Sequence, residues 1–295
     1  MGYQAAYTNT TATNLTAIGY QAGYTSNAAD NTFVGRQAGQ LTSSGAGNTA
    51  LGSTCLTNNS TGANNTAVGF YALVLNTTGS TNTAVGRAAY LTNTTGTAST
   101  AVGDFAGYSN TTGTSNAFFG QSAGNSNTTG GANAFLGREA GYYCTTGSGN
   151  TFINPNNSGL GYAPVFALTT ENNRVAIGST SVTNAYIQVA WTVVSDARDK
   201  TNIADVPHGL SFVQQLKPVS YQFKTSREDD TPNGNKRYGF LAQDILALED
   251  SDPVVIDNEQ PEKLRYNGES LVPILVKAIQ ELKAEVDSLK AQLNK

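Results

Sequence analysis

The chain has 295 residues and a formal net charge of -4, and its charge is unevenly distributed. Residues 1–194 carry only eight charged side chains, whereas residues 195–295 carry 30. Of the 31 glycines, 27 lie before residue 195, so two segments of different composition join near that point. The lack of a basic surplus argues against nucleic-acid binding, and no apolar run reaches the ~18 residues that a membrane span needs.

Few side chains are suited to metal binding. His208 is the only histidine, which excludes a multi-histidine zinc site, and a Ser-His-Asp site would have to be built around His208. Calcium-binding repeats are excluded because Asp30 and Asp104 are the only aspartates within the repeats described next, and hard cations need many carboxylates. We therefore expect no metal and no cofactor.

The first half of the chain repeats every 17 residues. The repeat is a tetrapeptide of the type Thr-Ala-Val-Gly, and all spacings of its glycine are 17 except for one of 16. Its glycines are Gly19, Gly35, Gly52, Gly69, Gly86, Gly103, Gly120 and Gly137. A second column contains Gly45, Gly62, Gly79, Gly96, Gly113, Gly130 and Gly147. Two columns in register predict a parallel β-solenoid with one coil per repeat.

Two adjacent columns before each glycine are apolar. One contains Ala17, Phe33, Ala50, Ala67, Ala84, Ala101, Phe118, Phe135 and Phe152, and the other Ile18, Val34, Leu51, Val68, Val85, Val102, Phe119, Leu136 and Ile153. Neighbouring strand residues point to opposite faces, so both faces of each strand need cover. One coil can bury only one of these columns. We therefore expect neighbouring chains to cover the other.

Three residues after each glycine stands a small side chain, which predicts a tight interior corner. Cys55 occupies one of these positions and is expected to be an inert core residue. Cys144 lies five coils further on, beyond disulfide reach at about 4.8 Å per coil.

An asparagine column lies four residues before the glycine and is interrupted by Ser99. Its members are Asn31, Asn48, Asn65, Asn82, Asn116 and Asn133. Stacked amides can form a hydrogen-bonded ladder along a solenoid, which is the preferred interpretation. An ice-binding or glycan-binding polar surface is the alternative.

The spacing, the two apolar faces and the Asn-Thr-Ala-Val-Gly pattern resemble the left-handed β-roll heads of trimeric autotransporter adhesins and related phage fibre shafts. The resemblance covers residues 1–154 in style only, since those heads use a different repeat length. It implies three chains side by side. The turn-forming residues at 154–159 are expected to end the array.

Residues 155–194 are predicted to be a connecting β region, the tip of the mature fibre, with strands within 174–178 and 185–194. Trp191 is interpreted as a packed trimer contact. The charged segment 195–295 is predicted to be a small α+β domain. It has strands near 218–223 and 253–256 and a strand that leads into a short helix over 238–244.

A helix over about 269–295 is predicted to end the chain, with Ser270 as its cap and Pro273 in its first turn. Its apolar seam contains Leu275, Ile279, Leu282, Val286, Leu289 and Leu293. The spacing by four and three is that of a coiled coil, and the distribution of Ile, Val and Leu slightly favours two strands.

Residues 195–295 resemble the C-terminal intramolecular chaperone family of phage tailspikes and tail fibres, whose best-known members are endosialidase tailspikes. The resemblance rests on Ser-Asp-x-Arg-x-Lys at 195–200, Gly-Phe-Leu-Ala-Gln at 239–243 and the heptad helix, in family order. It implies a domain that trimerises, guides folding of the fibre and then cuts itself off. Carried onto this chain, the nucleophile is Ser195, the base is Lys200, and the scissile bond joins Val194 to Ser195.

The implied chemistry is reasonable because a lysine can take a serine proton if burial favours its neutral amine. A gap of five residues suits neither one face of a helix nor one face of a strand. The loop must therefore turn to bring Ser195 and Lys200 together.

These features predict a trimeric β-solenoid segment of a phage tail fibre or tailspike, followed by a self-releasing chaperone. We expect a homotrimer in the virion, assembled in the host cytoplasm, that binds a cell-surface glycan receptor without membrane insertion. One alternative is a bacterial adhesin-like or ice-binding solenoid that carries the same domain, although the chain as written opens without a secretion leader. The other is a glycan-degrading tailspike that uses Asp30, Asp104, Glu139 or Glu171.

Overall fold

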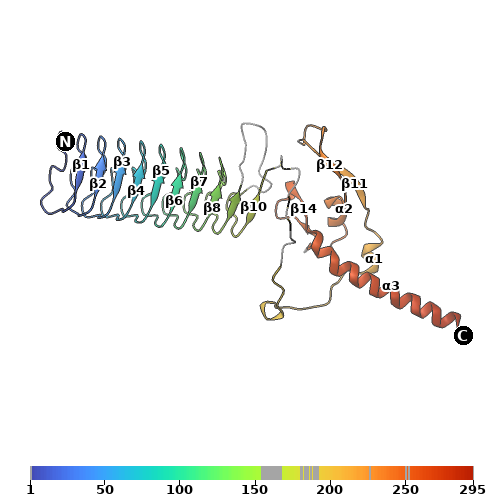
Figure 1. The fold of residues 1–295 in the computed structure, drawn as a ribbon. Coiled ribbons are helices and arrows are strands. Elements are labelled where there is room, and N and C mark those ends of the chain that lie inside the picture. The colour runs from blue at the N-terminus through green and yellow to red at the C-terminus, as the bar shows by residue number, and fades with distance from the viewer. Residues whose placement is uncertain are drawn as a thin grey trace. The chain divides into compact units, whose positions relative to one another are not determined.

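The computed structural model describes residues 2–153, 168–179, 182, 186, 188, 193–225, 227–249, 251 and 253–294. The chain divides into two compact units, Met1–Val182 and Thr183–Lys295, each of which is described by itself (Figure 1). Trp191 and most of the strand expected over 185–194 lie outside the described residues.

The first unit is a parallel β-solenoid whose ten strands pair in chain order (Figure 1). Each coil contributes one strand of three residues. The strands are β1 (Thr16–Ile18), β2 (Thr32–Val34), β3 (Thr49–Leu51), β4 (Thr66–Val68), β5 (Thr83–Val85), β6 (Thr100–Val102), β7 (Ala117–Phe119), β8 (Ala134–Leu136), β9 (Thr151–Ile153) and β10 (Val175–Ile177). Thr49 pairs with Thr66 and Thr66 with Thr83, which confirms the predicted 17-residue coil.

The expectation that the array ends at residue 154 is wrong. Strand β10 pairs in parallel with β9, with Val175 opposite Thr151 and Ile177 opposite Ile153. The connection between these strands is longer than in the other coils, but the side-chain contacts of the solenoid continue across it. Asn150 Nδ2 donates to the carbonyl oxygen of Glu171 at 2.8 Å, in place of the glycine carbonyl that other coils supply. A longer connection therefore interrupts the period without ending the stack.

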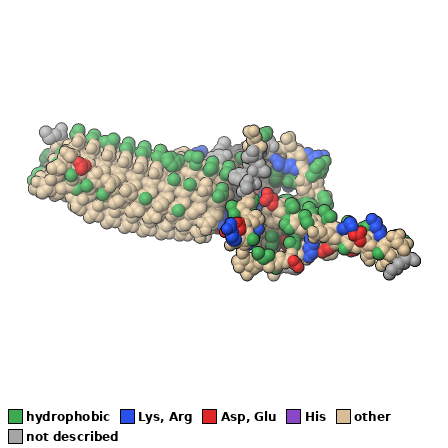
Figure 2. All heavy atoms as spheres, turned by 60° about the horizontal axis from the view of Figure 1, so that its bottom comes forward, with side chains coloured by type: hydrophobic (Ala, Val, Ile, Leu, Met, Phe, Trp, Pro, Cys, Tyr) green, Lys and Arg blue, Asp and Glu red, His purple; other side chains and the backbone are tan. Residues whose placement is uncertain are grey.

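The two apolar columns lie on opposite faces, as predicted. The Ala/Phe column faces the inside of the coil, and from Phe33 to Phe152 its members are at most 5% exposed. The Ile/Val/Leu column faces outward, where Ile18 is 50% and Leu136 53% exposed. Figure 2 shows hydrophobic side chains in rows along the solenoid surface. Within a single chain the second apolar face remains uncovered.

Both glycine columns are required by the close approach of successive coils. A Cβ on Gly69 would lie 2.6 Å from the carbonyl oxygen of Gly86, and one on Gly79 would lie 2.4 Å from that of Gly96. Gly69 also has a positive φ of +132, a conformation that favours glycine, whereas Gly79 does not have a positive φ. Spacing between coils, more than backbone conformation, therefore fixes the second column.

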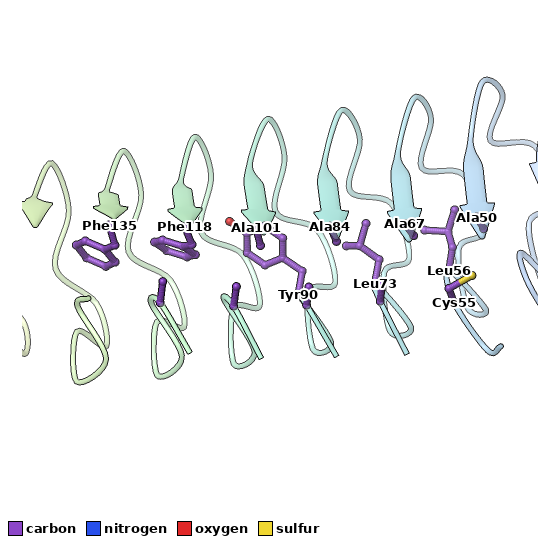
Figure 3. Close-up of a cluster of buried hydrophobic side chains, with 14 of the residues drawn as sticks. Ala50, Cys55, Leu56, Ala67, Leu73, Ala84, Tyr90, Ala101, Phe118 and Phe135 are labelled. Carbon is purple, nitrogen blue, oxygen red and sulfur yellow. The ribbon is translucent and has the colours of Figure 1, made fainter. Parts of the chain in front are cut away.

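The core is filled by pairs of side chains of complementary size. In the coils of β2 to β8 the buried middle residue of the strand is paired with the residue six positions later. The pair is Phe with Gly in β2, β7 and β8. It is Ala with Leu or Tyr in β3, β4 and β5 (Figure 3). A Cβ on Gly141 would lie 2.4 Å from the Phe135 ring, so a large strand residue leaves no room at the corner. In β6 both positions are small, Ala101 and Gly107, and the Tyr90 ring from the preceding coil fills the space.

We predict that exchanging the members of one pair is tolerated better than either single change. Leu73→Gly leaves a cavity beside Ala67 and should cost about 2–4 kcal/mol, while Ala67→Phe alone overpacks the coil at about 1–3 kcal/mol. The double variant recreates the Phe-Gly pair of β8 and also removes a left-handed residue, since Leu73 has a φ of 50. Thermal unfolding of the four chains tests this. A double variant no more stable than the sum of the single changes would contradict the pairing.

The asparagine column is a buried ladder that bonds mainly to backbone. Asn65 is fully buried, its Oδ1 accepts from the Asn82 backbone N–H at 3.0 Å, and its Nδ2 donates to the Gly79 carbonyl oxygen at 2.8 Å. The interruption at Ser99 coincides with the Tyr90 hydroxyl, which lies beside it. These side chains are not offered to a ligand, which removes the ice-binding or glycan-binding alternative for this column.

A second buried ladder escaped the sequence analysis. In it each amide donates directly to the amide before it, as Asn76 Nδ2 does to Asn59 Oδ1 at 2.8 Å. Its members are Asn59, Asn76, Asn93, Asn110 and Asn127. The next position in the column is Cys144, which ends the ladder because its thiol donates to the Gly147 carbonyl oxygen instead. The 17-residue spacing of these asparagines in the sequence could have indicated this second ladder.

The second unit is a small α+β fold. Its strands are β11 (Val219–Lys224), β12 (Pro232–Gly239), β13 (Ile256–Asp257) and β14 (Arg265–Tyr266). Its helices are α1 (Leu210–Val213), α2 (Ala242–Leu246) and α3 (Leu271–Leu293), with short 3-10 turns η2 (Ala197–Asp199), η3 (Pro261–Lys263) and η4 (Gly268–Ser270). β11 pairs with β12 and β13 with β14, both antiparallel. The predicted strand at 218–223 and the strand-to-helix step at 238–244 are confirmed, whereas only the end of 253–256 is a strand.

The core of this unit forms around the start of α3. Leu271 and Ile274 pack with Phe212, Ile245 and Val255, all at most 5% exposed. Ser270 stands at the N-cap position but makes no side-chain cap, because η4 runs directly into the helix and the Ser270 hydroxyl accepts from Asn267 Nδ2 instead. Within the part of the chain that the structure describes, no helix has the length and apolar character to span a membrane.

Candidate active site

Residues 195–200, the serine–lysine loop, bring the two predicted catalytic side chains together. Lys200 Nζ lies 2.6 Å from Ser195 Oγ and donates a hydrogen bond to it. The intervening residues form the 3-10 turn η2, and Lys200 N–H donates to the Ala197 carbonyl oxygen at 3.2 Å. This turn closes the gap of five residues that neither a helix nor a strand could close.

Asp196 and Arg198 hold the turn in shape. Asp196 Oδ1 accepts from the Arg198 backbone N–H at 2.9 Å and so caps η2. The Arg198 guanidinium also donates to the same carboxylate, with Nη2 2.6 Å from Oδ2. The hydrogen bond from the Arg198 side chain, and then that from its backbone, lower the pKa of Asp196. In the sequence these two residues were only elements of the motif, with no predicted role. In the structure they stabilise the turn of the serine–lysine loop.

The serine–lysine loop is open to solvent in the single chain. Ser195 and Lys200 are both exposed, and the preceding residues Val193 and Val194 are 66% and 80% exposed. A serine nucleophile gains most when its base and the developing oxyanion are shielded from water. The loop therefore brings the two predicted catalytic side chains together without the enclosure that would make them efficient.

The other groups that sequence analysis considered are engaged elsewhere. The His208 ring stacks on Phe212 with centroids 4.5 Å apart. Cys55 and Cys144 are buried free thiols, and burial raises their pKa to about 12 and about 11. Thiols of high pKa are poor nucleophiles, which fits the expected inert role of Cys55.

The carboxylates of the solenoid make local surface contacts. Asp104 pairs with Arg87 at 2.9 Å and Glu139 with Arg138 at 3.0 Å. Glu171 accepts from the backbone N–H groups of Thr169 and Thr170 at 2.7 and 2.9 Å, and Asp30 accepts from Asn14 at 2.8 Å. Among the described residues no three His, Cys, Asp or Glu side chains gather as a metal site would require.

Comparison with known protein families gives one match, which lies within the second unit. The family model described as chaperone of endosialidase, Peptidase S74, matches residues 195–252 and so begins at Ser195. No curated protein and no solved structure matches the chain. The family implies a self-cleaving serine peptidase, and its domains typically act in homotrimers. The C-terminal part of this chain is thus an endosialidase-type chaperone domain, typical of phage tail fibres and tailspikes, and it follows an N-terminal β-solenoid.

Proposed function

We propose that the chain is a segment of a trimeric phage tail fibre or tailspike whose C-terminal domain cleaves the bond between Val194 and Ser195. Ser195 is the nucleophile and Lys200 is the base. The observation that carries this proposal is the 2.6 Å contact between Lys200 Nζ and Ser195 Oγ at the first residue of the chaperone match. The shaft would remain in the virion after assembly in the host cytoplasm.

The cleavage can be written from these two side chains. Lys200 takes the proton of Ser195 Oγ, which attacks the carbonyl carbon of Val194. The bond from that carbon to Ser195 N breaks, the nitrogen takes a proton from Lys200, and an ester joins Val194 to Ser195 Oγ. Water then hydrolyses the ester to a Val194 carboxylate and a free Ser195. In the exposed loop the amine donates to the hydroxyl, so the reaction needs an enclosed state that favours the neutral amine.

Assembly of three chains would supply the enclosure. The predicted seam of α3 is uncovered, with Leu275 39%, Ile279 66% and Leu282 48% exposed. Val272 and Val276 are also 56% and 50% exposed, which widens the apolar surface at the start of the helix. A wide stripe suits a helix that touches two neighbours better than the narrow a/d seam of a two-stranded coil. The outward apolar column of the solenoid offers a second surface for the same neighbours.

We predict that Lys200→Met blocks cleavage while leaving assembly intact. Methionine keeps much of the side-chain length but cannot accept the serine proton, so the rate should fall at least about a hundredfold. Intact mass of the purified chain measures the cut, and light scattering measures assembly. Lys217→Met, at another exposed lysine of the same unit, is the matched control and should cleave normally. Normal cleavage by Lys200→Met would assign the base to another residue.

Host attachment is the role proposed for the shaft, with a cell-surface glycan as the receptor. A turnover glycosidase is disfavoured, because each acidic residue of the solenoid has a local partner. Binding of purified, cleaved shaft to host cells tests the attachment role, and an unbound shaft would count against it.

A further inference from the structure

One turn of α3 is fastened to the segment that follows the serine–lysine loop. Glu281 Oε2 accepts a hydrogen bond from the Leu210 backbone N–H at 2.6 Å. One turn earlier on the helix, Lys277 Nζ donates to the Val206 carbonyl oxygen at 2.5 Å and lies 3.8 Å from Glu281 Oε1. We call these contacts, with the adjacent Gly209, the Glu281 clamp.

Gly209 is shaped for this clamp. A Cβ at this position would lie 2.4 Å from Glu281 Oε2 and 2.5 Å from Oε1. The backbone of Gly209 has a φ of -149 and a ψ of -136. A side chain at this position would displace the Glu281 carboxylate. The contact between α3 and residues 206–210 is thus fitted from both sides.

The clamp joins the helix that carries the seam to the segment that follows Ser195 and Lys200 in the chain. Ile279 and Leu282, on the same stretch of α3, belong to the uncovered seam. On the other side, Val206 is joined to Lys200 only by residues 201–205, all of them exposed. At ~3.5 Å per residue this linker holds Lys200 within about 20 Å of the clamp. Paired helices lie about 8–10 Å apart, so a neighbouring α3 falls within that reach.

We propose that Glu281 is a positioning residue that couples trimer assembly to cleavage, an inference that rests on the proposed cleavage at Ser195. When three seams pair, the clamp fixes the end of the linker against the assembled helices. The serine–lysine loop is then presented to the neighbouring chain, which encloses it. Without the clamp the helices still assemble, but the loop is no longer held where assembly can enclose it.

The test compares cleavage and assembly in the full chain. Glu281→Ala should form the trimer but cleave at least tenfold more slowly. Glu281→Gln should recover most of the rate, since its amide oxygen can still accept from Leu210 N–H. Gly209→Ala should slow cleavage like Glu281→Ala, and combining the two should add little, because both remove one contact. Glu285→Ala, exposed one turn further along, is the matched control and should match the wild type.

Assembly is measured by light scattering in a Ser195→Ala background, so that release of the domain does not obscure it. Three results would overturn the inference: a Glu281→Ala trimer that cleaves at the wild-type rate, loss of the trimer in Glu281→Ala, or a Glu281→Gln chain as slow as Glu281→Ala. A wild-type chain that stays uncut under folding conditions would instead reject the proposed cleavage itself.

Discussion

The Ser195→Ala chain is expected to remain a single 30.8 kDa polypeptide, whereas the wild type separates into residues 1–194 and 195–295. Alanine removes the hydroxyl oxygen to which Lys200 Nζ donates a hydrogen bond in the serine–lysine loop. Without a nucleophile the cut should slow by at least about a thousandfold. Intact mass of both purified chains measures the result directly and also locates the scissile bond.

Assembly should survive this substitution. Ser195 is exposed and lies outside the core cluster formed by Phe212, Ile245 and Leu271. The seam of α3 is equally untouched, so Ser195→Ala should trimerise like the wild type before its release. Ser211→Ala, at an exposed serine of α1, is the control and should be cut normally. A Ser195→Ala chain that is still cut, or a wild-type cut elsewhere than after Val194, would reject the assigned nucleophile or bond.

The repeat made the solenoid predictable, because stacking demands the same side chain at the same height in every coil. The repeated glycines indicate that successive coils approach closely, and the two adjacent apolar columns indicate the two faces of the strand. Positions that change from coil to coil were harder to interpret. Leu73 and Tyr90 break the glycine pattern at their corner, but only because Ala67 and Ala84 leave room on the strand opposite. This exchange of size between columns is visible only when two positions six residues apart are compared.

The continuation of the array beyond Ile153 could not be predicted for a related reason. Spacing is the whole signal of a repeat, and the longer connection to β10 destroys it while the hydrogen bonds persist. Asn150 still donates across the junction, but it meets Glu171 where the other coils place a glycine. The strand Val175–Ile177 has only three residues, which is too short a pattern to be assigned to the solenoid without the 17-residue spacing.

For the candidate site, the resemblance supplied the predicted residues, whereas the contacts that support them could not be predicted. Ser195 and Lys200 stood out because the resemblance assigned them, and the sequence required a turn between them. The roles of Asp196 and Arg198 depend on a 3-10 turn that is set by local hydrogen bonds, which spacing alone does not reveal. The Glu281 clamp joins residues 71 positions apart, so no local pattern could have indicated it.

Residues 1–194 expressed alone are expected to aggregate or to assemble out of register, whereas the same residues released from the full chain should be soluble, heat-resistant trimers. The surface that neighbours would share is nearly the same at successive coils, since Val68, Val85 and Val102 follow one another on the outward face. Sliding one chain by a coil keeps most of these contacts and loses only the ends. The large and small core residues cannot correct such a slip, because they lie inside each solenoid and make no contact with a neighbour.

Register must therefore come from outside the repeat, and residues 195–295 with the α3 seam are the part of the chain able to set it. Once the domain has left, nothing remains to restore the register, so the released trimer should be held by a high barrier to unfolding and should not refold after melting. Sedimentation of the two preparations, followed by a heat, cool and reheat cycle of the released shaft, tests both halves of the argument. If residues 1–194 made alone give the same trimer in good yield, or if the melted trimer recovers on cooling, the solenoid sets its own register and needs no chaperone.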